Sequence, residues 1–550
     1  NPAPPLLYRN DDGVLVRSES EVGITSGARG RSPRWLDMDL DGDLDLILVN
    51  AAGINGGNGE QHIFYENLGD GTFQQKNVEN LENKHAEKLL ITDFNNDHID
   101  DILMFSPLSL WQGNGDFTYT NVSNDWLPSN VNGTFGVIAA TDIDIDNDGD
   151  LDLYLPRGEY YFTVADNDAA DFFPETNHLD VRGSGSQGTL PFEVTADGAI
   201  TISGLDVVRR NNYQGGYPLF LGSDLQEETL QNVEASLEIT PAMADGWSAD
   251  RTENGFYIGH IGNGVWQFES VRNDDIYWSI QFSLDGINSF TPTGWTPNNR
   301  NVQDMLLRND GDGFTEVSDE WNIPVGGNHW GVTTGDFNND SHADLYIHRF
   351  GYLKNRISDY LLLNTGNGNF DITTAHAANN VGAENHGDMG QAFDYNLDGK
   401  VDILNGDDEF GLWHLYENES PTLGNYVLVR VGYGPNTNVD PISAEVTVYT
   451  PDNQYFKRVG SAGEAHSQSL LNMVHFGLGS DNFVNSVEIR WRTGETVSAT
   501  NLPANQIIQS SAILPVELLA FNGFPVENGV QLNWKTATEV NNEKFEIQRS

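Results

Sequence analysis

Asp144-Ile-Asp-Asn-Asp-Gly-Asp-Leu-Asp152 is the stretch on which the interpretation of this chain depends. Every second residue is a carboxylate, and Gly149 stands between the third and fourth of them: Asp144, Asp146, Asp148, Asp150 and Asp152. Like charges packed this closely are costly unless a cation holds them together. Hard oxygen ligands on a short loop with a glycine turn suit Ca²⁺. An EF-hand would need a glutamate where Leu155 stands, and the following Leu-Asp-Leu-Tyr-Leu alternates as a strand. The stretch therefore predicts a calcium loop between two strands.

The same loop recurs along the chain, and each copy is followed by a strand-like run. The first copy has Asp37, Asp39, Asp41, Asp43 and Asp45; the second has Asp93, Asn95, Asp97 and Asp101; the fourth has Asp336, Asn338, Asp340 and Asp344; the fifth has Asp394, Asn396, Asp398 and Asp402. The sequence therefore predicts about five Ca²⁺ sites. His98 and Ser341 replace the turn glycine in the second and fourth copies, so we expect those two sites to be the weaker or vestigial ones.

A second motif, a strand followed by a glycine turn and another strand, accompanies the loops. It occurs at Phe64–Phe73, Leu306–Phe314 and Leu362–Phe370. A repeat with several strands per period is typical of a propeller. These residues resemble the FG-GAP/VCBS repeats of integrin-type β-propellers, over roughly 1–420. The resemblance implies four-stranded blades with calcium held between strands. Five blades are recognisable and seven would fit the family, so the blade count stays open.

Two segments of the 1–420 region need separate interpretations. The hairpin at Leu7–Val16 precedes any calcium loop, and we expect it to complete a blade begun at the other end of the repeats, closing the ring. The long interval between the third and fourth loops predicts an insertion at 157–300 within one blade. Its short strand-like runs indicate a small β-sandwich, with two degenerate blades as the alternative.

Composition limits the partners and the location. The chain has 28 Lys and Arg against 81 Asp and Glu, a formal net charge of −53, which argues against nucleic acid and anionic membranes. It has no cysteine, and no apolar run is long enough to span a membrane. Weak calcium loops fill at extracellular rather than cytosolic calcium levels. We therefore expect an extracellular or cell-surface protein in which Ca²⁺ stabilises the fold.

The composition changes near Gly424. Half-buried strands are predicted at Asn425–Val431 and Val487–Trp491, with His475-Phe-Gly-Leu-Gly479 between them. This order resembles the ASPIC/UnbV domain that follows FG-GAP repeats in cartilage-acidic-protein-like secreted proteins, over 424–512. Residues 513–550 read as the first strands of a fibronectin-III-like domain. The stretches Leu514-Pro-Val-Glu-Leu518 and Phe545-Glu-Ile-Gln-Arg549, which we expect to be strands, resemble the segment before the sorting domain of bacterial proteins exported by the type IX pathway. The resemblance implies that route of export.

The fold prediction is thus all-β: a calcium-binding β-propeller with an inserted β-sandwich-like domain and C-terminal β domains. No nucleophile elbow, phosphate loop or cysteine nucleophile is present, so the sequence favours a binding protein over an enzyme. The predicted function is adhesion or binding of a protein or glycan ligand at the cell exterior. The alternatives are a carbohydrate-active lyase or hydrolase with a site at the channel mouth, and a subunit of an extracellular assembly.

Four basic residues precede the calcium loops at similar distances: Arg29, His85, His329 and His386. In a propeller they would stand at the entry to the innermost strands. We hypothesise that they form a polar ring around the axis that binds an anionic ligand, against the alternative that they are ordinary loop residues.

Overall fold

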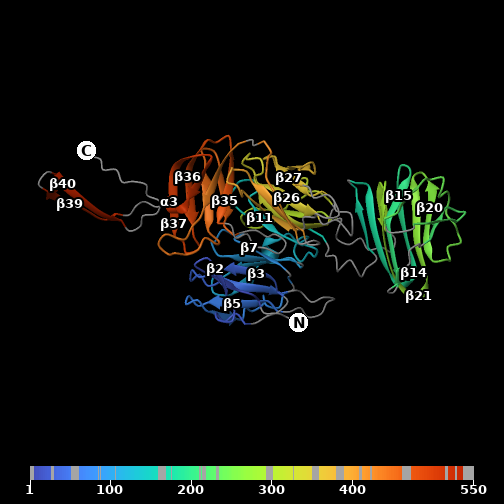
Figure 1. Cartoon of the computed structure of the whole chain (residues 1–550), viewed down its shortest axis with the longest axis horizontal. Helices are drawn as coiled ribbons and strands as arrows, with labels where there is room; N and C mark the ends of the chain where they lie inside the picture. The colour runs from blue at the N-terminus through green and yellow to red at the C-terminus, as the bar shows by residue number, and fades with distance from the viewer. Residues whose placement is uncertain are drawn as a thin grey trace.

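The computed structural model in Figure 1 shows a chain built almost entirely of β-strands. It describes the chain except for residues 1–4, 26–29, 51–60, 85, 87, 106, 159–168, 175, 210–211, 214–217, 231–233, 293–301, 326–327, 350–357, 379–388, 408–411, 422–423, 461–471, 514–517, 527–528 and 537–550. The prediction of an all-β fold is confirmed.

Five antiparallel sheets repeat along the chain, and we call them blades 1 to 5. Blade 1 consists of β3 (Gly30–Leu36), β4 (Asp45–Asn50), β5 (Ile63–Asn67) and β6 (Phe73–Lys76). Blade 2 consists of β7 (Leu89–Thr92), β8 (Asp101–Met104), β9 (Ser109–Gly113) and β10 (Tyr119–Asn121), followed by the short helix α1 (Ser123–Trp126). Blade 3 consists of β11 (Thr141–Ile143), β12 (Asp152–Leu155), β23 (Met305–Asn309) and β24 (Phe314–Glu316). Blade 4 consists of β25 (His329–Gly335), β26 (Asp344–Arg349), β27 (Tyr360–Asn364) and β28 (Phe370–Thr373). Blade 5 has three strands, β29 (Met389–Phe393), β30 (Asp402–Asp407) and β31 (Leu412–Tyr416).

The second strand of each blade carries the apolar run that follows a calcium loop. In blades 2 and 3 every residue of this strand is buried. A continuous apolar run is what a strand covered on both faces requires, because its side chains alternate between two packed neighbours. The cores between blades follow chain order, and each draws its residues from two consecutive blades.

Asparagine side chains on the third strands link consecutive blades. The Nδ2 atom of Asn309 donates to the carbonyl of Phe94 at 2.7 Å, which joins blade 3 to blade 2. Asn364 reaches from blade 4 to blade 3, and Asn418 from blade 5 to blade 4, through equivalent bonds of 2.8 Å to Ile145 and Phe337. The blades are thus arranged in sequence order, and the number that completes a ring stays a prediction.

The described residues do not show the predicted closure of the ring by the N-terminal hairpin. The hairpin consists of β1 (Tyr8–Asp11) and β2 (Val14–Arg17), and in the described chain these strands pair only with each other. The segment lies against blade 1: Leu7 packs on its core, and the Phe73 amide donates to the Val22 carbonyl at 2.8 Å. Blade 5 has a third strand of its own, so the hairpin's first strand has no place there.

The insertion leaves blade 3 between β12 and β23 and forms a separate body, green in Figure 1. Its strands join in one ten-stranded sheet: β13 (Ala169–Phe173), β14 (His178–Thr195), β15 (Ile200–Arg209), β16 (Asn212–Tyr213), β17 (Pro218–Leu221), β18 (Gln226–Thr229), β19 (Ser236–Ile239), β20 (Gly255–Gly262), β21 (Val265–Asp285) and β22 (Ser289–Pro292). The sheet encloses a hydrophobic core drawn from the insertion alone, with Trp266 fully buried in it. This arrangement is unlike a pair of degenerate blades.

The C-terminal domain has two sheets with one core between them. Their strands are β32 (Asn425–Arg430), β33 (Glu445–Tyr449), β34 (Gln454–Arg458), β35 (Met473–Gly479), β36 (Phe483–Arg490), β37 (Thr496–Pro503) and β38 (Gln506–Gln509), followed by α3 (Ser510–Ile513). Beyond them β39 (Leu518–Val526) and β40 (Gly529–Thr536) form a hairpin. The strand expected at Phe545–Arg549 lies outside the described residues. Of the helices in the described chain, none is long and apolar enough to cross a membrane.

Candidate metal centres

The five Asp-rich loops join the first and second strands of the five blades, and they share one backbone conformation. The fourth residue of every loop lies in the left-handed region: Leu40, Asn96, Asn147, Asn339 and Leu397. The sixth residue does as well, with φ of 98° at Gly42, 95° at Gly149 and 88° at Gly399. His98 and Ser341 adopt the same conformation, with φ of 68° and 81°, although their Cβ atoms make it strained. The two divergent loops therefore keep the geometry of the others, and their affinity stays a prediction.

The first aspartate of each loop holds the turn together. The Asp93 carboxylate accepts backbone N–H bonds from Asp97 at 3.1 Å and from His98 at 3.0 Å. Asp336 and Asp394 accept the equivalent pairs in the fourth and fifth loops. The loop therefore curls around its own first carboxylate, which places the third and fifth side chains beside it.

The last aspartate of each loop anchors it to the sheet. One carboxylate oxygen of Asp152 accepts the Ile145 amide at 2.8 Å, and the other accepts the Asn309 amide of the third strand at 2.7 Å. The same two bonds recur at the last aspartate of the other loops: Asp45, Asp101, Asp344 and Asp402. The sequence pattern predicts that these residues are metal ligands. In the structure they also accept backbone N–H bonds, and each carboxylate oxygen keeps one further lone pair.

The predicted ligands converge most closely in the first and third loops. Asp37, Asp39 and Asp41 present oxygens within 4.8 Å of one another, and so do Asp144, Asp146 and Asp152. The Asp150 carboxylate, at the seventh position of the third loop, accepts a bond from Asn96 of the second loop at 2.5 Å.

The second, fourth and fifth loops have asparagine at the third position. The side-chain oxygens of Asn95, Asn338 and Asn396 each accept the N–H of the fifth residue of their loop. The fifth residues, Asp97, Asp340 and Asp398, use one oxygen to accept the N–H of the seventh residue. These three loops carry fewer carboxylates than the first and third loops but keep the same backbone conformation.

Burial makes the ionised form of these carboxylates costly. Burial raises the pKa of Asp93 to about 6, of Asp144 and Asp336 to about 7, and of Asp101 to about 9. Asp37 Oδ1, Asp39 Oδ1 and Asp144 Oδ2 are buried and have no hydrogen-bond partner within the described chain. Buried oxygens without partners are rare and call for an explanation. The donor set of several hard oxygens fits Ca²⁺.

The C-terminal domain covers the face of the blades that carries the loops. At the first loop, Arg492 Nη2 donates to the Gly42 carbonyl at 2.7 Å, and its Nε lies 3.8 Å from Asp37. At the fourth loop the Gly479 amide donates to Asn339, and at the fifth a ring nitrogen of His475 bonds the Gly399 carbonyl at 3.1 Å. Loops far apart in the chain are therefore held by one domain.

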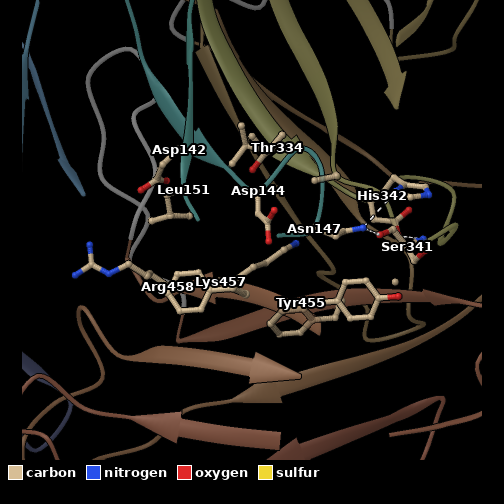
Figure 2. Close-up of a pocket in the computed structure, with 16 residues that line it drawn as sticks. Asp142, Asp144, Asn147, Leu151, Thr334, Ser341, His342, Tyr455, Lys457 and Arg458 are labelled. Carbon is tan, nitrogen blue, oxygen red and sulfur yellow. Dashed lines mark hydrogen bonds between the residues drawn. The ribbon is translucent and has the colours of Figure 1, made fainter. Parts of the chain in front are cut away.

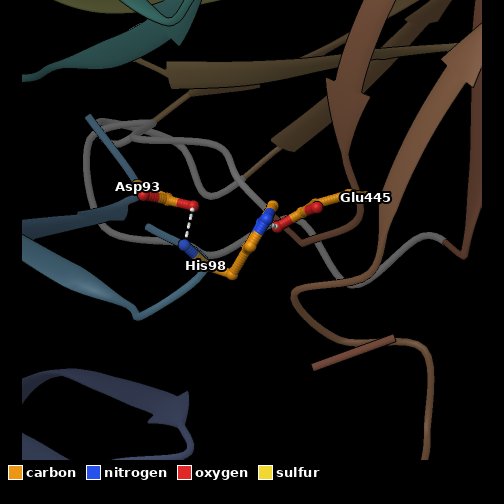
Figure 3. A group of neighbouring side chains, drawn as sticks. All are labelled: Asp93, His98 and Glu445. Carbon is orange, nitrogen blue, oxygen red and sulfur yellow. Dashed lines mark hydrogen bonds and ion pairs between the residues drawn. The ribbon is translucent and has the colours of Figure 1, made fainter. Parts of the chain in front are cut away.

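The second loop has the densest contacts with this domain. Figure 3 shows the His98 ring facing Glu445, with Nδ1 and Oε1 2.9 Å apart, beside Asp93. Arg458 forms a buried ion pair with Asp100, whose other oxygen accepts the Ser443 hydroxyl at 3.0 Å. Burial opposes the charge of Arg458, but its aspartate neighbours outweigh burial and raise its pKa.

A cavity of about 80 Å³ lies between the third and fourth loops and the C-terminal domain. Figure 2 shows Asp144, Asn147 and Ser341 on the blade side, facing Lys457 and Tyr455. Burial lowers the pKa of Lys457, and the nearby loop aspartates oppose that effect. A larger cavity of about 370 Å³ continues along the same interface toward blade 5. Sequence reasoning missed the contacts of Lys457, Arg458 and Arg492 with the loops. The one sequence feature that could have drawn attention to them is that they are basic residues in a chain with few.

The hypothesised polar ring finds no support in the described part of the chain. Arg29, His85 and His386 lie outside the described residues. His329 is fully buried, and its Nδ1 lies 2.6 Å from a carboxylate oxygen of Asp304. This contact is that of a core histidine.

Comparisons with known proteins agree with the two parts of the chain. Residues 434–512 match the family model described as ASPIC and UnbV, and residues 273–347 match the model of an FG-GAP-like repeat. The chain therefore carries an FG-GAP-like repeat and a C-terminal ASPIC/UnbV domain, as the sequence predicts. These two features suggest a β-propeller-like protein-binding protein.

A comparison with curated proteins finds no match. Among solved structures, the pilus adhesin SpaC from Lactobacillus rhamnosus GG in its open conformation is 11% identical. The similarity covers 63% of this chain and 57% of that chain, at a TM-score of 0.08. A score this low carries no argument about fold or function.

Proposed function

We propose that this protein is a secreted or cell-surface calcium-binding propeller protein that binds a protein or glycan ligand, as an adhesin does, with Ca²⁺ in a structural role. The observation that carries the proposal is the set of buried carboxylate oxygens without partners in loops that share one frame. Asp37, Asp39 and Asp41 would hold one ion, and Asp144, Asp146 and Asp152 another.

The contribution of calcium to stability follows from mass action. A site whose dissociation constant lies about tenfold below the ambient calcium concentration adds about 1.4 kcal/mol. Five independent sites of that affinity would add roughly 7 kcal/mol, as much as the whole net stability of a typical domain. Calcium would thus take the part that disulfides play in other exported proteins, and this chain has no cysteine. Export by the type IX pathway belongs to the same proposal and is supported by the resemblance of residues 513–550.

The test is a thermal melt of the full chain with and without excess chelator, read beside bound calcium from elemental analysis. We expect about five Ca²⁺ per chain and a large fall in melting temperature on chelation. Little bound calcium with an unchanged melt would refute the structural role. Export is tested separately, by locating the protein in cells that lack the type IX machinery.

Assembly through an open sheet edge is a second candidate function, because blade 5 lacks a fourth strand among the described residues.

A further inference from the structure

The repeats show how the space between two blades is normally filled. In blades 2 and 3 a tryptophan follows the fourth strand and packs toward the next blade. The Trp126 ring lies 4.5 Å from that of Phe94 and 6.0 Å from that of Phe314 in blade 3. The Trp321 ring lies 5.3 Å from that of Phe370 in blade 4. Two aromatic side chains therefore close each of these junctions: one from the trailing segment, and one from the start of the next blade's fourth strand.

Blade 4 lacks the first of these two side chains. Ala377 stands as far beyond Phe370 as Trp321 stands beyond Phe314. A methyl group cannot occupy the volume of an indole, so the junction between blades 4 and 5 is left open. A cavity of about 330 Å³ lies there, lined among others by Tyr346, Leu361, His376, Ile403 and Tyr416.

In the described chain, blade 5 lacks the second of these side chains, the aromatic residue that begins a fourth strand. In the other four blades the fourth strand begins with an aromatic residue, paired with the end of the third strand: Phe73, Tyr119, Phe314 and Phe370. Asn418 marks the equivalent end in blade 5, and its amide donates to Asp402 at 2.7 Å as Asn364 does to Asp344 at 2.8 Å. Among the described residues, no strand pairs with the outer edge of β31.

The last strand of blade 5 also exposes apolar side chains. Trp413 is 57% exposed and Leu415 is 46% exposed, and strand alternation places them on the face opposite Tyr416. An unpaired edge of this kind is a template for another strand. Glu417 and Glu419 border the cavity and are exposed. The edge therefore offers backbone pairing, an aromatic-sized cavity and negative charge in one place.

We propose that β31 and this cavity form a docking site for an extended peptide segment of a partner protein. The segment pairs with β31 as the fourth strand of blade 5 and places an aromatic side chain in the cavity. The equivalent strands of blades 1 to 4 show which occupant the site fits. Basic residues beside the aromatic residue complement the two glutamates. Backbone pairing supplies affinity, and the cavity supplies specificity. The inference rests on the protein-binding part of the proposed function and is independent of calcium.

The experiment uses a peptide that copies the chain's own fourth strand. A fluorescein-labelled peptide with the sequence of residues 367–374, Asn-Gly-Asn-Phe-Asp-Ile-Thr-Thr, extended by two lysines, is titrated with the full chain and followed by anisotropy. We expect saturable binding that weakens at least tenfold when serine replaces the peptide's phenylalanine. Absence of saturable binding, or equal binding of the serine peptide, would overturn the proposal.

Two matched variants locate the site on the protein. Ala377→Lys puts a charged side chain in the cavity lining, which opposes burial of the peptide's phenylalanine and repels its lysines, so we expect peptide binding to weaken at least tenfold. Ala375→Lys is the control, because Ala375 is exposed and does not line the cavity, and we expect unchanged binding. A thermal melt of each variant establishes that it is folded. Undiminished binding to Ala377→Lys would refute the placement, and the serine peptide decides the matter if that variant does not fold.

Two further measurements distinguish this inference from self-association and from the calcium proposal. Sedimentation of the free chain tests for a second copy at the site: a dimer that Ala377→Lys dissociates would replace the partner peptide with self-association. Repeating the titration in chelator, at a temperature where the chain remains folded, separates the inference from the calcium proposal. Binding that persists without calcium supports the docking site even where the metal proposal fails.

Discussion

The third and second loops have the same backbone and different charges. The third loop has a carboxylate at every second position, Asp144 to Asp152, and a turn glycine. The second has Asn95 and His98 at two of the corresponding places, and the C-terminal domain brings Glu445 and Arg458 to it. Hydrogen bonds to the first and last aspartates set the frame in both. The comparison shows that the backbone conformation of a loop is separable from its charge.

The largest expected effect is a reversed pH dependence of stability without calcium. Burial raises the folded-state pKa of Asp144 to about 7 and of Asp93 to about 6, against 3.8 for an ordinary aspartate. Groups with raised pKa values stabilise the folded state when protonated. In chelator, stability is therefore lowest above pH 7, rises as pH falls toward 4, and changes by about 1.4 kcal/mol per pH unit for each titrating group.

The check is a series of melts between pH 8 and pH 5, in calcium and in chelator. In calcium the bound ion would favour the ionised carboxylates, so the rise on acidification should vanish. A chelated protein that is most stable at pH 8 would contradict the burial argument.

The next largest effect concerns the ion pair at the second loop. Arg458→Met leaves Asp100 buried and without its cation, which typically costs about 3–5 kcal/mol. Denaturant unfolding measures the loss. The control is Arg490→Met, because Arg490 is more exposed and lies 3.9 Å from Glu445, so the expected loss is within about 1 kcal/mol. Equal losses in the two variants would show that Arg458 is not special.

The last aspartate should matter in both loops even without calcium. Asp152→Ala and Asp101→Ala each remove the acceptor of two backbone N–H groups, at roughly 1–3 kcal/mol for each donor left unsatisfied. The free energy of unfolding is measured in calcium and in chelator. A loss seen only in calcium would mean that this residue acts through the metal rather than through the backbone.

The smallest effect separates the loops by charge alone. Asp146→Asn gives the third loop the third residue of the second loop, and we expect a loss of about 1.4 kcal/mol in calcium if affinity falls about tenfold. In chelator the same change should be neutral or stabilising, because Asp146 is repelled by Asp148. The reverse change, Asn95→Asp, should increase the stabilisation by calcium. Calorimetric titration of the two variants measures both affinities.

The pattern within the loops could be predicted from sequence because the loop is local. Alternating carboxylates, the turn position and the following apolar run all lie within about a dozen residues, so position and frame follow from spacing. Glu445 and Arg458 contact the second loop although they lie more than 340 residues away in the sequence, and no local sequence pattern predicts such a contact. His98 was interpreted as a departure from the turn glycine, although its ring contacts the C-terminal domain.

The N-terminal hairpin shows a second limit of sequence reasoning. The pattern at Tyr8–Arg17 identifies two strands and the turn between them, but not the sheet that they join. The Ser18 amide donates to Leu7 as the Val317 amide does to Leu306, so the hairpin has the form of an outer strand pair. It stands beside blade 1 rather than completing blade 5. Ring closure depends on long-range packing, which a hairpin motif does not encode.

The lid that the C-terminal domain forms over the loops has a kinetic consequence. The fourth loop has no exposed residue, so an ion there could exchange with solvent only as fast as the domain lifts, and its removal should depend on time rather than on chelator concentration. The other loops expose Asp41, Asp97, Asp146 and Asp398, so chelator could reach ions there directly.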